Sequence, residues 1–315
     1  MSTAAVTRSF SAVLLIAAAT LLTACGGSGD APQSASGDKA PAAAAKAGKA
    51  APSRPEDELP AARCPSTAGA SLPGPDIVGL KLGMGFDEAL NHARCAMPEG
   101  VFGFTPRWFQ QLQTGSVQLE RQGFTIQRGD TSECVFKQIG DAQKCGLGRR
   151  VWDHIDELVS VASPGLDGRQ AVAGIWRQQH WKPGDMPSRA AVLQALRDKY
   201  GREGELTEQQ HGTLSWRYDP AGNPLAATDP LFQQCYGIRA RPGTQSWSEG
   251  CGLSISADLV PPRDNPELVQ SLYVGIAHQE NLLKLGDAMQ AELDRIDAER
   301  RASEVEQASG AAPTL

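Results

Sequence analysis

The chain has 315 residues and a formal net charge of −6, with 30 lysines and arginines against 36 aspartates and glutamates. The cations are scattered and form no basic patch, so the composition excludes the usual electrostatic signature of a nucleic-acid-binding protein. Seven cysteines are compatible with a disulfide framework if the chain is exported to an oxidising compartment.

The first 24 residues have the three parts of a secretory signal. A short leading segment carries one cation, Arg8, and residues 12–22 form an apolar run that is too short to span a bilayer. The segment ends in Leu22-Thr23-Ala24-Cys25, which resembles the bacterial lipobox, where a diacylglycerol is attached to the cysteine before cleavage ahead of it. We therefore predict a lipoprotein signal peptide over residues 1–24 and lipidation at Cys25, and the loss of Arg8 gives a mature charge of −7. The alternative is an ordinary signal, or an uncleaved anchor, in which this cysteine is incidental.

A lipid on Cys25 predicts a stable membrane anchor, because two or more acyl chains hold a protein at a bilayer where one does so only marginally. Gly26 follows, where related lipoproteins of the inner membrane often carry Asp. This favours the outer membrane, with the protein facing the periplasm. The next residues are mostly Ala, Gly, Pro, Ser and Lys, so residues 25–63 are expected to be the lipidated cysteine and a disordered linker.

The other six cysteines are even in number, as expected of disulfides in an exported protein. No Cys-x-x-Cys motif is present, which argues against a thioredoxin-type redox site or a zinc knuckle. Six cysteines allow 15 pairings, and we predict that sequence neighbours pair. The predicted pairs are Cys64 with Cys95, Cys134 with Cys145, and Cys235 with Cys251.

A first folded module is expected over residues 64–182. Residues 75–85 predict a short apolar strand or turn. Residues 86–94 predict a helix with Phe86, Leu90 and Ala93 on one face. Strands are then expected at the alternating pairs Val117/Leu119 and Phe124/Ile126, at Val135-Phe136, and over residues 155–162 and 171–178, which are joined by a turn at residues 164–168.

A second module is expected over residues 183–304. Ser188 is the predicted N-cap of a helix that ends at Gly201. In residues 251–259 the odd positions are apolar and the even positions small or polar, which predicts a strand with one buried and one wet face. The apolar positions of the helix are Leu193, Leu196 and Tyr200, and further strands are expected at Leu214/Trp216/Tyr218 and Leu272/Val274/Ile276.

The C-terminal segment carries an apolar stripe at helical spacing, formed by Leu282, Leu285, Met289, Leu293 and Ile296. We expect this helix to pack on its own domain; docking of a partner helix, or self-association, is the alternative. Residues 305–315 are expected to be a disordered tail.

A helix followed by antiparallel strands therefore occurs twice, which predicts an α+β protein of two helix-plus-antiparallel-sheet modules with a C-terminal helix, stapled by disulfides. The run from Leu82-Gly83-Met84-Gly85 to Ala89 resembles the helix start of small envelope lipoproteins of the SmpA/OmlA type and of β-lactamase-inhibitor-protein-like modules. Residues 187–201 resemble the corresponding helix of bacterial secreted proteins, although Gly201-Arg202-Glu203 replaces the Gly-x-Pro that often ends it. The resemblance implies two helices against a small antiparallel sheet and a role in binding without chemistry. It assigns no contact residue.

The sequence shows no recognisable spacing of catalytic or metal-binding residues. His92, His154, His180, His211 and His278 are well separated, and a strand would place His154 and Glu157 on opposite faces, so we predict no metal site and no cofactor. Gly-x-Ser-x-Gly and phosphate-loop motifs are absent. Aromatic residues at Trp108-Phe109, Trp152, Trp176 and Trp181 are expected to pack in the core, with a sugar or peptide groove as the alternative.

The leading hypothesis is a lipid-anchored envelope protein that acts by binding or scaffolding, with the membrane and an envelope protein as partners. One alternative is a cell-wall-active hydrolase, which would have a deep cleft that gathers two or more of Asp153, His154, Glu157, His180 and His211. Another is a hydrolase inhibitor with a protruding loop between Cys235 and Cys251. Enzymatic activity is thus left open.

Overall fold

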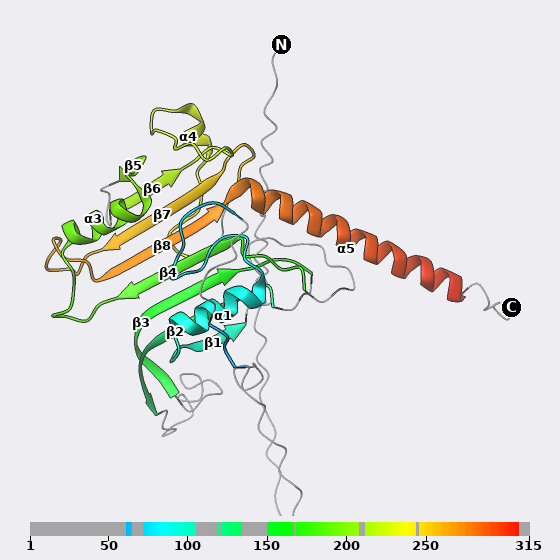
Figure 1. The fold of residues 1–315 in the computed structure, drawn as a ribbon, viewed down its shortest axis with the longest axis horizontal. Coiled ribbons are helices and arrows are strands. Elements are labelled where there is room, and N and C mark those ends of the chain that lie inside the picture. Colours follow the sequence, from blue (N-terminus) through cyan, green and yellow to red (C-terminus); the bar gives the residue numbers. More distant parts are fainter. Residues whose placement is uncertain are drawn as a thin grey trace, which may run out of the picture. The chain divides into compact units, whose positions relative to one another are not determined.

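The folded chain is built on one antiparallel sheet of eight strands (Figure 1). The computed structural model describes residues 61–64, 72–104, 117, 119, 121–133, 150–166, 168–207, 212–243 and 246–308, all of which belong to the compact unit Pro52–Leu315. The strands are β1 (Val101–Phe104), β2 (Gly123–Glu133), β3 (Arg150–Ala162), β4 (Gly174–His180), β5 (Glu205–Thr207), β6 (Thr213–Arg217), β7 (Leu253–Val260) and β8 (Ser271–His278). An α+β architecture with antiparallel strands is therefore confirmed.

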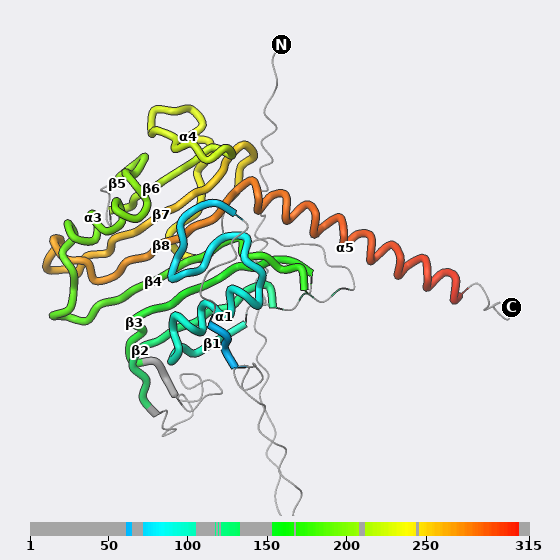
Figure 2. The backbone as a smooth tube through the Cα atoms, in the orientation of Figure 1, coloured from blue at the N-terminus to red at the C-terminus, as the bar shows by residue number. Residues whose placement is uncertain are grey.

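Each half of the chain starts at one edge of the sheet and ends at its centre. The order is β1-β2-β3-β4-β8-β7-β6-β5, so two four-stranded meanders meet at the pairing of β4 with β8 (Figure 2). This pairing runs from Gly174 opposite Ala277 to His180 opposite Ser271. Because β4 and β8 are each bonded on both sides, the two halves of the chain share one uninterrupted sheet.

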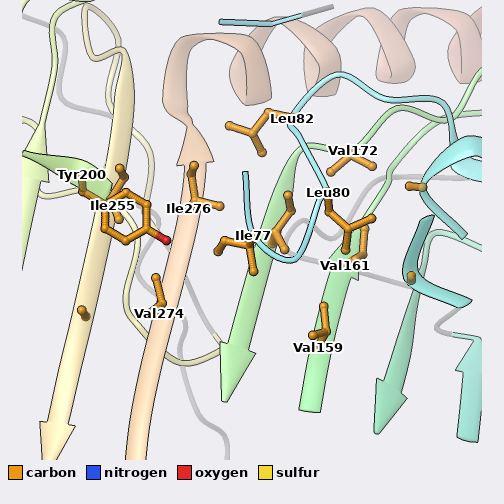
Figure 3. Close-up of a cluster of buried hydrophobic side chains, with 14 of the residues drawn as sticks. Ile77, Leu80, Leu82, Val159, Val161, Val172, Tyr200, Ile255, Val274 and Ile276 are labelled. Carbon is orange, nitrogen blue, oxygen red and sulfur yellow. The ribbon is translucent and has the colours of Figure 1, made fainter. Parts of the chain in front are cut away.

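Two helices pack on the same face of the sheet, and we call this the helix face (Figure 1). Helix α1 (Phe86–Ala96) precedes the first meander and α3 (Arg189–Tyr200) precedes the second. The segment before α1 crosses β8, β4 and β3 between the helices and buries Ile77, Leu80 and Leu82 (Figure 3). One hydrophobic cluster therefore extends from Phe124 on β2 to Trp216 on β6.

The two helices are attached to the sheet by matching backbone contacts. Gly85, the N-cap of α1, forms an isolated bridge with Ala171 just before β4, and Ser188, the N-cap of α3, forms one with Leu268 just before β8. The hydrogen bonds around these bridges also match. The Val172 amide donates to Met84 and the Phe86 amide to Gln170 in the first half, as the Val269 amide donates to Pro187 and the Arg189 amide to Glu267 in the second.

The opposite face of the sheet is also covered in its middle, and we call this the back face. The indole of Trp176 donates to the Arg239 carbonyl at 3.0 Å, and Ile238 packs with Leu282 of α5 (Gln279–Ala308). Gly275 permits this approach, since a Cβ there would lie 2.5 Å from the Arg239 oxygen. The expectation of one wet face for β7 is therefore wrong: Ser254 and Ser256 are buried beneath this cover.

The predicted helices are confirmed with small differences. Helix α1 buries Phe86, Leu90 and Ala93, together with Ala89. In α3 the cap at Ser188 and the end at Gly201 are as expected, but Val192 is buried with Leu196 and Tyr200 while Leu193 is only partly buried. Helix α5 continues to Ala308, past the expected start of the tail at residue 305. A short helix not predicted from the sequence, α4 (Pro230–Gln234), starts at the N-cap Asp229.

The predicted strands are found, with one exception among the described residues. Val117 and Leu119 lie in no strand, and Val135-Phe136 falls outside the described residues. The start of α5 packs on its own domain, as expected, through Leu282 and Leu285. Of the remaining stripe, Met289 and Leu293 are buried and Ile296 is half-buried.

Two of the predicted disulfides are present, Cys64–Cys95 beside α1 and Cys235–Cys251 beside the back face. Cys134 and Cys145 fall outside the described residues, as do Cys25 and the linker up to residue 60. The Cys235–Cys251 bond ties the start of β7 to the segment that supplies Ile238 and the Arg239 carbonyl, so it holds the back-face cover in place.

Across the described part of the chain, no helix has the length and apolarity needed to cross a membrane.

Replacing both Cys235 and Cys251 by alanine is expected to lower the free energy of unfolding by about 3 kcal/mol, because the bond closes a loop with a sequence separation of 16 residues in the unfolded chain. Urea unfolding measures this loss. The same variant should become susceptible to proteolysis near Tyr236, whereas the matched Cys64→Ala/Cys95→Ala variant should keep that segment protected. Unchanged unfolding and an unchanged cleavage pattern would contradict the assignment.

Candidate binding pocket between helix α3 and the sheet

A pocket of about 340 Å³ lies between α3, the sheet and the segment before α1. This volume is within the range of small-molecule sites. Most of the wall is aliphatic or aromatic, with few polar groups. The lining residues are Ile77, Arg177, Gln179, Trp181, Pro187, Ala191, Val192, Ala195, Leu196, Lys199, Tyr200, Leu272 and Val274.

The pocket owes its shape to short side chains on one side of α3. Val192, Leu196 and Tyr200 point at the sheet and are buried. The adjacent row, Ala191 and Ala195, lies one residue earlier in each turn and is exposed at the mouth. Because alanine ends at Cβ, this row leaves open the space between the helix and strands β4 and β8.

The C-terminal end of α3 holds Tyr200 firmly in the wall. Its ring lies 5.5 Å from the ring of Trp216, whose indole donates to the Gly201 carbonyl at 2.9 Å. Burial, together with the nearby negative charge of Asp76, raises the pKa of Tyr200 to about 12. The hydroxyl therefore stays protonated at physiological pH. It points toward Ile77 and Val274 (Figure 3).

A tight turn over residues 77–80 forms the other side of the mouth. Val78 and Gly79 both have positive φ, 53° and 78°, and the turn is closed by the Ile77–Leu80 bridge. Asp76 accepts the Gly79 amide at 2.8 Å and lies 3.6 Å from Lys199 of α3. Burial acts to raise the pKa of Asp76, but the Gly79 amide and Lys199 outweigh it, so this pKa is lowered and the carboxylate stays charged.

A buried carboxylate orients the arginine in the pocket floor. Glu157 is almost fully buried, and it accepts hydrogen bonds from the Arg177 Nε at 2.6 Å and the Arg128 Nε at 3.0 Å. The two guanidiniums balance the carboxylate and leave one net positive charge. Arg177 and Gln179 are alternate residues of β4, so both side chains face the pocket.

A second group of polar residues lies on the back face. The His180 Nδ1 is 2.7 Å from the Ser271 hydroxyl, and its ring is 5.8 Å from that of Tyr273 and 6.4 Å from that of His154. The other ring nitrogen, Nε2, contacts the Gln178 amide. The cavity beside this group is about 10 Å³, room for about one water. Ser271 is itself buried, whereas His180 is half-buried.

The residues singled out from the sequence are thus only partly brought together. His154 and His180 are neighbours, but Glu157 turns to the other face, and Asp153 accepts from the Ser132 hydroxyl at the end of the sheet. His211 and Trp108-Phe109 lie outside the described residues. Among the residues that the structure places, no group of three or more His, Cys, Asp or Glu side chains is arranged to hold a metal ion.

The two tryptophans that flank His180 have different roles. Trp176 packs in the core of the back face, as expected. Trp181 lines the pocket, a position that fits the alternative of a sugar or peptide groove. Sequence reasoning missed Arg177, Gln179 and the alanine row. A single signal could have indicated the row, since Ala191 and Ala195 are four residues apart on a predicted helix.

No family model, curated protein or solved structure matches this chain.

Stability is expected to fall as the pH drops below about 6.5, the ordinary histidine pKa. Burial lowers the pKa of His180, and the positive charges of His154 and Arg241 lower it further. Burial also lowers the pKa of His278, whose Nδ1 accepts the Asn281 amide at the start of α5. The unfolded chain therefore binds protons before the folded one does, and this favours unfolding.

Urea unfolding at pH 7.5, 6.5 and 5.5 tests this expectation. A His180→Gln/His278→Gln variant should lose less stability than the wild type between pH 7.5 and 5.5. Equal pH dependence of the two proteins would rule out these histidines as the cause.

Proposed function

We propose that this chain is a lipid-anchored envelope protein that faces the periplasm and acts by binding, with the pocket beside α3 as its ligand site. The observation that carries the proposal is the pocket itself: about 340 Å³ of mostly apolar space that opens at the exposed alanine row. A mostly apolar cavity of this size with a few polar groups is the usual form of a small-molecule site. The lipobox-like ending at Cys25 and the linker after it support the anchor.

The second part of the proposal is that the sheet consists of two modules, each a helix followed by a four-stranded meander. The matching bridges and hydrogen bonds at Gly85 and Ser188 support this equivalence. The pocket lies where the two modules meet, because β4 and Ile77 come from the first and α3 and β8 from the second. The site is then a product of their association, and neither module alone would form it.

The competing classes receive less support from the geometry. A hydrolase would need a substrate cavity at the contact between His180 and Ser271, but Ser271 is buried and the cavity beside this group has room for about one water. An inhibitor would need a protruding segment between Cys235 and Cys251, but Ile238 and Ala240 of that segment are packed against the sheet. Tyr236 is exposed and Trp247 is partly buried, so these are the described aromatic residues of this segment that a partner could contact.

The anchor is tested by Cys25→Ser. The variant should be lost from the membrane fraction of lysed cells, because the thiol that carries the lipid is gone, while the wild type should remain there after a high-salt wash. Cys134→Ser is a suitable control, since it also removes one cysteine but leaves the lipobox intact. Membrane retention of the Cys25→Ser chain would refute the lipid anchor.

The pocket is tested with N-phenyl-1-naphthylamine, a neutral apolar fluorophore, on the chain from Gly26 to Leu315, which keeps every described residue. We expect saturable binding at one site. Ala195→Trp should weaken it at least tenfold, because the indole occupies the mouth of the pocket. Ala190→Trp is the matched control, since Ala190 is exposed on α3 but does not line the pocket, and it should bind as the wild type does. Equal binding by the two variants would place the probe elsewhere.

A further inference from the structure

We propose that the natural ligand of the pocket is a single-chain aliphatic carboxylate, with its carboxylate at Arg177 and its chain along the apolar wall. This inference rests on the proposed binding function and specifies the class of ligand. The wall that would take the chain is formed by Val192 and Leu196 on one side and by Leu272 and Val274 on the other.

Hydrogen-bond donors that bond to no described residue gather in this pocket. Within the described part of the chain, the Tyr200 hydroxyl, the Gln179 amide and the terminal nitrogens of Arg177 have no hydrogen-bond partner, although all three residues line the cavity. The high pKa of Tyr200 keeps its hydroxyl a donor. Three donor groups in one mostly apolar pocket are matched by a ligand whose polar end only accepts, and an ionised carboxylate is such a group.

The charge around the pocket also favours a monoanion. The Arg128–Glu157–Arg177 group keeps one net positive charge, and the Lys199–Asp76 pair at the mouth is neutral. Because Glu157 fixes Nε of Arg177, the rest of the guanidinium is held in place for a ligand. Charge-assisted bonds from a pre-oriented arginine to a carboxylate are among the stronger hydrogen bonds in proteins.

The backbone around the pocket argues for an aliphatic chain over a peptide. A bound peptide gains affinity when its main chain pairs with a free strand edge. Strands β4 and β8, which form the floor, are each paired on both sides and offer no edge. A chain of methylenes needs no hydrogen bonds and gains affinity by burial alone.

The test is calorimetric titration of the chain from Gly26 to Leu315 with hexanoate, octanoate and decanoate, and with decan-1-ol as the neutral counterpart. We expect one site, an affinity that rises about fourfold per methylene until the pocket is full, and decan-1-ol binding at least tenfold more weakly than decanoate. Arg177→Gln should weaken decanoate at least tenfold and leave decan-1-ol unchanged. The matched comparison is Arg128→Gln, which removes the same charge from beside Glu157 but takes no donor out of the pocket, so it should weaken decanoate clearly less than Arg177→Gln does.

Tyr200→Phe is the second variant, in case loss of the Arg177–Glu157 pair unfolds the protein. It removes a hydroxyl that bonds no described residue, so the fold should persist while decanoate affinity falls about tenfold. Equal affinity for decanoate and decan-1-ol, or decanoate binding that neither variant weakens, would overturn the inference. If the neutral fluorophore binds but decanoate does not, the carboxylate assignment fails and the binding function stands. If neither binds, both fail. Preferential binding of a peptide with an apolar C-terminal residue would assign the pocket to a protein terminus instead.

Discussion

The pairing of β4 with β8 is the interaction on which the rest of this structure depends. These strands lie far apart in the sequence, and their seven-residue register joins two meanders that would otherwise end in exposed edges. It also sets the distance between α1 and α3, because each helix is fixed to the segment just before one of these two strands. The core, the position of the pocket and the cover of the back face all follow from this central ladder.

The two faces of the sheet are stabilised by different means. The helix face is a continuous apolar layer from Phe124 to Trp216, and its stability comes from removal of that surface from water. The back face has a smaller apolar cluster around Trp176, Ile238 and Leu282, and its buried serines and Gly275 add close approach and hydrogen bonds. Gln279 illustrates this, because it is fully buried and uses both ends of its side-chain amide. Its Nε2 donates to the Ser254 hydroxyl, and its Oε1 accepts the backbone amide of Ser248. The Cys235–Cys251 disulfide adds a covalent tie beside this cover.

The pocket arises because the two helices meet the sheet differently. Around α1, the core is closed by Phe86, Met97 and the segment that carries Ile77 and Leu80. Around α3, small side chains leave space that no described residue fills, and the polar groups of β4 point into it. A pocket of this kind, with mostly apolar walls and a few hydrogen-bond donors, contributes little to folding.

Local signals in the sequence determined much of this protein. The caps and apolar spacing predicted α1 and α3, alternation predicted β2, β6 and β8, and the pairing of neighbouring cysteines predicted Cys64–Cys95 and Cys235–Cys251. These depend on residues close together in the chain. The tertiary structure alone decided which strands became neighbours, and therefore which residues met. Three features illustrate this: the burial of Ser254 and Ser256, the ion pair of Glu157 with Arg177, and the pocket between α3 and β4. Each depends on a partner many residues away, and no local pattern in the sequence specifies that partner.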